Sequence, residues 1–288
     1  MVPSTLPLMQ KYLRTARHEW RPFVIYGVSY ALLSLLVPLI VQLLVNNLAL
    51  AGLNLSLFTL TVVLTGGLVF LQLSRLAQIV LLEYLERKLL ALYAPRFSGL
   101  VEKKRLMFFE LATVPKSLSK WALEGFEIFL ALLVGTLILM VYHPFFIALT
   151  FLIWFSLVGV YWLGKTGLAT ALEESRQKYD LWFALNGTGK QVNTHDWLFA
   201  REAHFRILKR QIILLMAVQV IGTVALMSVG ALLFHAGELS LGQFVAAELI
   251  GGGIFVALAK LCKFMETHYA LVTSFLKIDH ALETHHDR

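Results

Sequence analysis

Apolar residues gather in six long runs along the chain, and polar and charged segments separate these runs. The runs are Phe23–Val45, Phe58–Ser74, Phe126–Tyr142, Phe145–Leu163, Ile212–Phe234 and Leu241–Ala259. Each is close in length to the ~20 helical residues that cross a hydrocarbon core about 30 Å thick. A backbone inside lipid must satisfy its own hydrogen bonds, as a helix does. The pattern therefore predicts an all-α membrane protein with six transmembrane helices.

The segments between the runs differ sharply in positive charge. All 25 Lys and Arg residues lie in segments 1–22, 75–125, 164–211 and 260–288. The connections that contain none are 46–57, 143–144 and 235–240. In multi-pass proteins the excess of Lys and Arg marks the cytoplasmic side. We therefore expect both termini in the cytoplasm and a location in the plasma membrane, the inner membrane if the cell is bacterial.

The composition is typical of a membrane protein and excludes some classes of partner and site. The mean hydropathy is +0.72 and 58% of the residues are hydrophobic, which is too apolar for an ordinary soluble domain. The basic isoelectric point near 9.5 follows from the cytoplasmic flanks, so we expect no nucleic acid partner. The single cysteine, Cys262, excludes an intrachain disulfide and a thiolate zinc site.

Residues 1–22 do not have the pattern of a cleavable signal, because the following apolar run is too long and no small-residue cleavage site ends it. Their apolar residues alternate with Lys and Arg, which favours a cytoplasmic interfacial helix leading into the first span. We divide the chain into this helix, a six-span domain over residues 23–283, and a polar tail over residues 284–288.

The two long basic segments are expected to be helical. Ile79–Tyr93, Leu168–Leu185 and His195–Arg210 place apolar residues at helical spacing between charged ones. Turn signals divide each segment into two antiparallel arms: Ala112–Pro115, with Ser117 and Ser119 as helix caps, and Asn186–Gly189. Arms of this length would reach ~30–35 Å beyond the membrane at 1.5 Å per residue.

These features, with several local sequences in the same order, resemble the transmembrane domain of ABC exporters (ABC transporter type 1). The local sequences are His143-Pro144 after Met140–Tyr142, Arg96-Phe97, Met107–Glu110, Gly237–Ala246, and Leu276–Glu283. The resemblance covers roughly residues 10–283. It implies a homodimer or heterodimer in which spans four and five cross to the partner, and a separate ATPase subunit that docks on the tips of the cytoplasmic loops.

The chain itself is not expected to be an ATPase or another enzyme. Gly187–Lys190 is similar to part of a P-loop, but Ala184 and Gln191 stand where the motif needs Gly and Ser or Thr. Leu239–Gln243 is similar to the signature motif of ABC ATPases, yet it lies at the external end of a span. No cofactor is expected on this chain, and ATP with Mg²⁺ would be bound by the partner subunit.

The resemblance places the two coupling tips at Thr113–Trp121 and Leu185–Trp197. Their basic, polar and aromatic residues are the candidate contacts with the ATPase: Lys116, Lys120, Trp121, Lys190, Asn193, His195, Asp196 and Trp197. Tryptophan is enriched in interface hot spots, which favours Trp121 and Trp197. The alternative is that the two tryptophans hold the cytoplasmic helices to one another.

Glu248 is the one carboxylate well inside a predicted span, and an intramembrane charge indicates a functional site. The alternative is a hydrogen bond from Glu248 to Gln219 or another span. Amides that could line the same substrate pathway are Gln219, Gln243, Gln42, Asn46, Asn47 and Gln72. Such amides also tie helices together in membranes, for ~1 kcal/mol or less.

Three consecutive glycines, Gly251, Gly252 and Gly253, interrupt the sixth span. Each weakens a helix by up to ~1 kcal/mol relative to alanine, so we expect the three glycines to have a structural or functional role that offsets this loss. A hinge for alternating access and close helix packing are the two alternatives. His280, His285 and His286 do not form a metal site by themselves, and no metal is expected.

Three functions stay open on these observations. The first is an exporter subunit that works by alternating access, with membrane lipids, a second transmembrane subunit and a separate ATPase as partners. The second is a membrane scaffold or receptor that keeps the fold and uses no ATP. The third is the membrane part of a longer exporter subunit. Lipids, peptides and amphipathic drugs fit the spans equally well as substrates.

Overall fold

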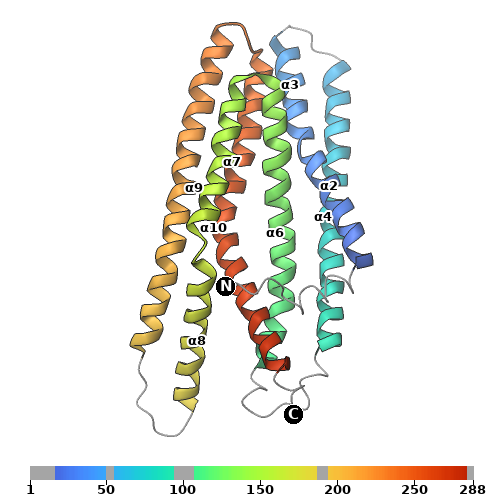
Figure 1. Ribbon diagram of the computed structural model, residues 1–288. Helices are drawn as coiled ribbons and strands as arrows, with labels where there is room; N and C mark the ends of the chain where they lie inside the picture. Colours follow the sequence, from blue (N-terminus) through green and yellow to red (C-terminus); the bar gives the residue numbers. More distant parts are fainter. Residues whose placement is uncertain (1–16, 50–54, 94–106, 187–193, 284–288) are drawn as a thin grey trace.

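The computed structural model describes residues 17–49, 55–93, 107–186 and 194–283, and within them it contains helices and no strand (Figure 1). The helices are α2 (Arg17–Ser34), α3 (Leu36–Ala49), α4 (Leu55–Tyr93), α6 (Met107–Tyr142), α7 (Phe145–Leu163), α8 (Gly167–Asn186), α9 (His195–His235) and α10 (Leu241–Glu283). Six helical segments are long and apolar enough to cross a membrane: Trp20–Asn47, Phe58–Lys88, Val114–Tyr142, Phe145–Leu163, His195–His235 and Leu241–Lys277. The prediction of an all-α, six-span membrane protein is confirmed.

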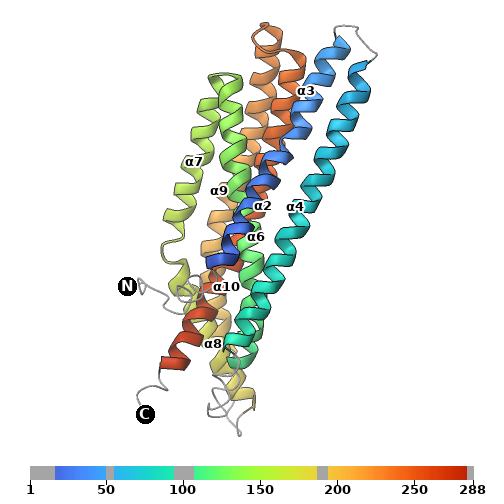
Figure 2. The same cartoon turned by 90° about the vertical axis from the view of Figure 1, so that its right-hand side faces the viewer.

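The helices run side by side along one long axis, as two perpendicular views show (Figures 1 and 2). At one end, here called the short-loop end, turns join α6 to α7 and α9 to α10. At the other, here called the extended end, α8 and the far ends of α4, α9 and α10 continue past the apolar runs. With 41 residues, α9 is about 62 Å long, twice the thickness of a hydrocarbon core.

The predicted helical extensions are confirmed. Ile79–Tyr93 belongs to α4, Leu168–Leu185 to α8 and His195–Arg210 to α9. The extension after the fourth span is a separate helix, because Gly164–Thr166 form a turn between α7 and α8. The ring of Tyr269 lies against this turn, and an added Cβ on Gly167 would stand 2.4 Å from its hydroxyl oxygen.

The packing of α10 organises the bundle. It contacts α6, α9, α3 and α8, while α2 packs mainly on α4. The main buried cluster joins α6, α7, α9 and α10 through residues such as Leu139, Phe146, Leu215 and Leu258. In this single chain α7 and α9 thus lie against α6 and α10 of the same chain. The exchange of spans four and five with a partner stays a prediction.

The first span consists of two helices rather than one. The helix α2 ends at Ser34, Leu35 forms a turn, and α3 begins at Leu36. Pro38 explains the break, since it has no N–H to donate to the carbonyl of Ser34 four residues earlier. At the other end of α2, Pro22 lies inside the helix, so residues 17–22 continue directly into the span.

The predicted turn at Ala112–Pro115 is wrong. All four residues are helical within α6, and so are Ser117 and Ser119, which are not helix caps. A buried stripe explains why the proline does not end the helix: Val114, Leu118 and Ala122 are spaced four residues apart and pack with Leu85 of α4 and Phe275 of α10. The segment Thr113–Trp121 is therefore the side of a long helix and not the tip of a loop.

Candidate functional site

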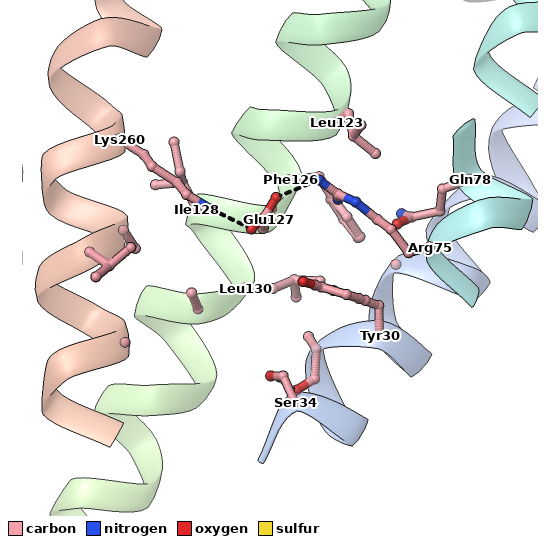
Figure 3. A pocket seen from close by; sticks show the side chains of 16 residues that line it. Tyr30, Ser34, Arg75, Gln78, Leu123, Phe126, Glu127, Ile128, Leu130 and Lys260 are labelled. Atoms are coloured by element: carbon pink, nitrogen blue, oxygen red, sulfur yellow. Dashed lines mark hydrogen bonds and ion pairs between the residues drawn. The ribbon is translucent and has the colours of Figure 1, made fainter. Parts of the chain in front are cut away.

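A pocket of about 210 Å³ lies between α2, α4, α6 and α10 (Figure 3). Most of its lining is apolar or glycine. The polar side chains in its wall are Tyr30, Ser34, Arg75, Gln78, Glu127 and Lys260. The pocket is thus an apolar space with a small number of polar groups, which is typical of a ligand site.

The three charged residues of the pocket stand at the same level because each marks the boundary of an apolar run. Arg75 follows the last residue of the second run, and Lys260 follows the last residue of the sixth. Glu127 is the second residue of the third run. Since the second, third and sixth spans lie side by side, their boundaries meet, and the three charges come together at the edge of the apolar layer toward the extended end.

The charges form one network around the Glu127 carboxylate. Arg75 donates from Nη2 to Oε2 at 2.8 Å, and Lys260 donates from Nζ to Oε1 at 2.7 Å (Figure 3). The guanidinium of Arg75 also lies 5.2 Å from the centre of the Tyr30 ring. The network connects α2, α4, α6 and α10. Two cations and one carboxylate give it a net charge of +1, so the pocket favours an anion.

Gln78 is the deepest polar group of the pocket, and its side chain is incompletely bonded. It is only 2% exposed. Its Nε2 donates to the carbonyl of Phe23 at 3.4 Å, whereas its Oε1 is buried and accepts no hydrogen bond in the described part of the chain. A buried acceptor without a donor is uncommon and costs ~1–3 kcal/mol.

Three of the seven predicted pathway residues make structural hydrogen bonds at the short-loop end. Gln42 accepts from the Tyr142 hydroxyl at 2.7 Å, which ties α3 to α6. Asn46 accepts from the backbone N–H of Gly242 at 3.0 Å, which ties α3 to the first turn of α10. Gln243 and Ser240 bond each other's backbone N–H as a capping box at the start of α10.

Of the other four candidates, Asn47 is half-buried and Gln72 is exposed. Glu248 and Gln219 lie further from the short-loop end and are both half-buried. Oε1 of Glu248 is buried and has no hydrogen-bond partner in the described residues, Gln219 included. Glu248 is therefore an intramembrane carboxyl group with one buried oxygen that accepts no hydrogen bond from the described residues. It does not line the pocket around Glu127. Its place on a substrate pathway stays a prediction.

The three glycines of α10 have different surroundings. The helix continues without interruption through all of them. An added Cβ on Gly251 would lie 2.1 Å from Leu226 Cδ2, so this glycine permits the close packing of α10 on α9. Added Cβ atoms on Gly252 and Gly253 would meet nothing within 4 Å. Packing thus explains Gly251, while a hinge role stays a prediction for all three.

We expect Gly251→Ala to lower the free energy of unfolding by about 1–3 kcal/mol, because Leu226 is 1% exposed and has little space to move away. Gly252→Ala should raise it by up to ~1 kcal/mol through helix propensity alone. Denaturant unfolding in detergent micelles compares the two neighbours directly. Equal effects of both substitutions would contradict the packing role of Gly251.

Two of the first candidate coupling residues, Trp121 and Lys120, contact side chains of their own chain. Trp121 donates from Nε1 to Nδ1 of His268 at 3.0 Å and stacks on Phe264 of α10, with ring centres 5.9 Å apart. Lys116 and Lys120 are exposed on α6, and Lys120 lies 3.9 Å from Glu124. This geometry favours the alternative in which Trp121 holds two helices together.

The second set of coupling candidates is only partly described. Lys190 and Asn193 lie outside the described residues. His195 and Asp196 open α9 and are exposed. Trp197 is half-buried, with Nε1 unbonded among the described residues and the Arg201 guanidinium 5.8 Å from its ring centre. Trp197 therefore differs from Trp121 in two ways. It lies at the start of a helix, and the contacts described for it do not include α10.

Arg75, Glu127 and Lys260 were not candidates from sequence. Glu127 is separated from its partners by 52 and 133 residues, so no local pattern joins them. The available signal was their position, since all three stand at the boundary of an apolar run. No group of three or more His, Cys, Asp or Glu in the described ranges could hold a metal ion.

No protein-family model matches the chain, and no curated protein matches it significantly.

Proposed function

We propose that the chain is the transmembrane subunit of an ABC exporter-type transporter in the plasma membrane, the inner membrane of a bacterium. Two such subunits, identical or different, form the substrate pathway, and a separately encoded ATPase supplies ATP and Mg²⁺. The extended end then lies in the cytoplasm with both termini, as the distribution of Lys and Arg indicates. Six spans with long helical extensions support this arrangement.

The observation that carries the proposal is the difference between the two ends of the bundle. Toward the extended end, a charged pocket lies at the boundary of the apolar layer. At the short-loop end, hydrogen bonds join α3 to α6 and α10, and His143 Nε2 lies 2.8 Å from Glu238 Oε2 across two turns. Alternating access requires a site that is available from one side while the other side is closed.

The proposal predicts a stable complex with an ATPase. We expect tagged protein, purified from its native membrane in mild detergent, to bring down an ATPase subunit in a fixed ratio. Trp197→Ala should reduce the amount of ATPase recovered by about tenfold, the size of a single hot-spot contact. Trp162→Ala is the matched control, because Trp162 is 65% exposed on α7 and distant in sequence from the start of α9.

One outcome would count against the proposal, and another would count only against the docking role of Trp197. A purified complex with neither a nucleotide-binding subunit nor ATPase activity would favour the scaffold or receptor that uses no ATP. If Trp197→Ala recovers as much ATPase as the unchanged chain, the transporter proposal stands, but the start of α9 is not part of the surface on which the ATPase docks.

A further inference from the structure

We infer that the pocket between α2, α4, α6 and α10 binds the headgroup of an anionic glycerophospholipid, with a phosphodiester of charge −1 and a hydroxyl donor. Phosphatidylglycerol has this chemistry. As the substrate class of a transporter the inference rests on the proposed function. Binding itself needs no ATPase, so the two can fail separately.

The charges of the pocket fit one phosphodiester. Arg75 and Lys260 both engage Glu127 and leave a net charge of +1 at the boundary of the apolar layer. One phosphodiester brings the sum to zero, and neutrality is favoured where water is scarce. The Lys260 side chain is 49% exposed, so it can turn part of its donor capacity toward a ligand while Arg75 keeps the carboxylate.

The unbonded acceptor defines the second part of the headgroup. Gln78 lines the pocket, and its buried Oε1 has no donor in the described residues, so a rotation of the amide toward the pocket would let a headgroup hydroxyl donate to it. Tyr30 and Ser34 add hydroxyl groups to the same wall. The glycerol of phosphatidylglycerol has two hydroxyl donors beside its phosphate. The choline of phosphatidylcholine has no hydrogen-bond donor, so it would leave Gln78 unsatisfied.

The surface next to the pocket suits an acyl chain. Going along α10 from Lys260 toward the middle of the membrane, the exposed residues are Ala259, Val256, Gly253, Gly252 and Leu249. An added Cβ on either glycine would meet nothing within 4 Å, so this strip is open and flat. The pocket of about 210 Å³ is below the roughly 300–1,000 Å³ of sites that hold a whole drug-sized ligand. It would hold a headgroup while the chains lie outside.

Native mass spectrometry of the detergent-purified chain tests the inference, because it resolves single bound lipids. The probes are dioleoyl phosphatidylglycerol, dioleoyl phosphatidylcholine and soluble glycerol phosphate. We expect phosphatidylglycerol to bind about tenfold more tightly than phosphatidylcholine, the effect of one charge-assisted interaction. Glycerol phosphate should bind much more weakly than the lipid, because it lacks the acyl chains.

Two pairs of variants assign the binding to this pocket. Lys260→Gln should weaken phosphatidylglycerol about tenfold, whereas Lys263→Gln, which removes the same charge from an exposed position outside the pocket, should not. Gly253→Leu should block the lipid, because the new side chain fills open space in the pocket wall. Gly66→Leu adds the same side chain to open space on α4, outside the pocket, and should bind normally.

Equal affinity for the two lipids, or an unchanged affinity in both Lys260→Gln and Gly253→Leu, would overturn the inference. Binding of glycerol phosphate as tight as that of the lipid would also overturn it, in favour of a soluble phosphate ester. If the pull-down recovers no ATPase but the lipid still binds, only the proposed transporter function is contradicted, and the lipid site stands.

Discussion

Glu127→Gln is expected to lower the free energy of unfolding by about 2–4 kcal/mol. The substitution leaves the Arg75 guanidinium and the Lys260 ammonium beside a neutral amide at the edge of the apolar layer. Removing one partner of a buried ion pair costs roughly 3–5 kcal/mol. The Lys260 side chain is 49% exposed and can turn toward water, which reduces the expected loss.

The matched control is Glu83→Gln on α4. Glu83 also accepts from an arginine, Arg87, at 2.8 Å, but that pair is four residues apart on one helix and exposed. Its loss should cost less than ~0.5 kcal/mol. Denaturant unfolding in detergent micelles measures both variants. If Glu127→Gln were no more destabilising than Glu83→Gln, the network would not hold the three spans together.

A second substitution separates the loss of the ion pairs from the remaining positive charge. Lys260→Met added to Glu127→Gln removes one of the two unpaired cations and keeps an apolar side chain of similar length. We expect it to recover about half of the lost stability, because the cost comes mainly from unpaired charge. The double variant should therefore be more stable than Glu127→Gln alone. If each substitution simply removed a stabilising interaction, the double variant would be less stable instead.

The six spans could be predicted because their signal is local and strong. A run such as Phe145–Leu163 must be helical in lipid whatever its neighbours are, and the helical extensions also show their period within one segment. The break at Leu35 was also accessible in principle, since Pro38 lies inside the first run. None of these features depends on which helices pack against each other.

Packing decided the features that were missed. Pro115 is a turn signal on its own, yet the contacts of Val114 and Leu118 with Leu85 and Phe275 keep α6 helical around it. The partners Arg75 and Lys260 meet Glu127 only once α4, α6 and α10 are side by side. Glu248 has the stronger intramembrane signal in the sequence but no hydrogen-bonded partner for Oε1 in the described structure.

Trp121→Ala is expected to lower the free energy of unfolding by about 2–4 kcal/mol. The side chain is half-buried and stacks on Phe264 and His268, so truncation leaves a gap between α6 and α10. Trp121→Phe should cost only about 1 kcal/mol, because it keeps the stacking and loses the hydrogen bond to His268 Nδ1 at 3.0 Å. Denaturant unfolding of both variants tests this order.

The same variants decide between the two roles of Trp121. If Trp121 only holds α6 to α10, Trp121→Phe remains folded and should recover as much ATPase per folded molecule as the unchanged chain. In a double-mutant cycle of Trp121→Phe with His268→Ala, the double variant should lose about 1 kcal/mol less stability than the sum of the two single losses. The reason is that both substitutions remove the same hydrogen bond. A folded Trp121→Phe that loses the ATPase would mean that the indole faces the partner subunit, against the contact that the single chain shows.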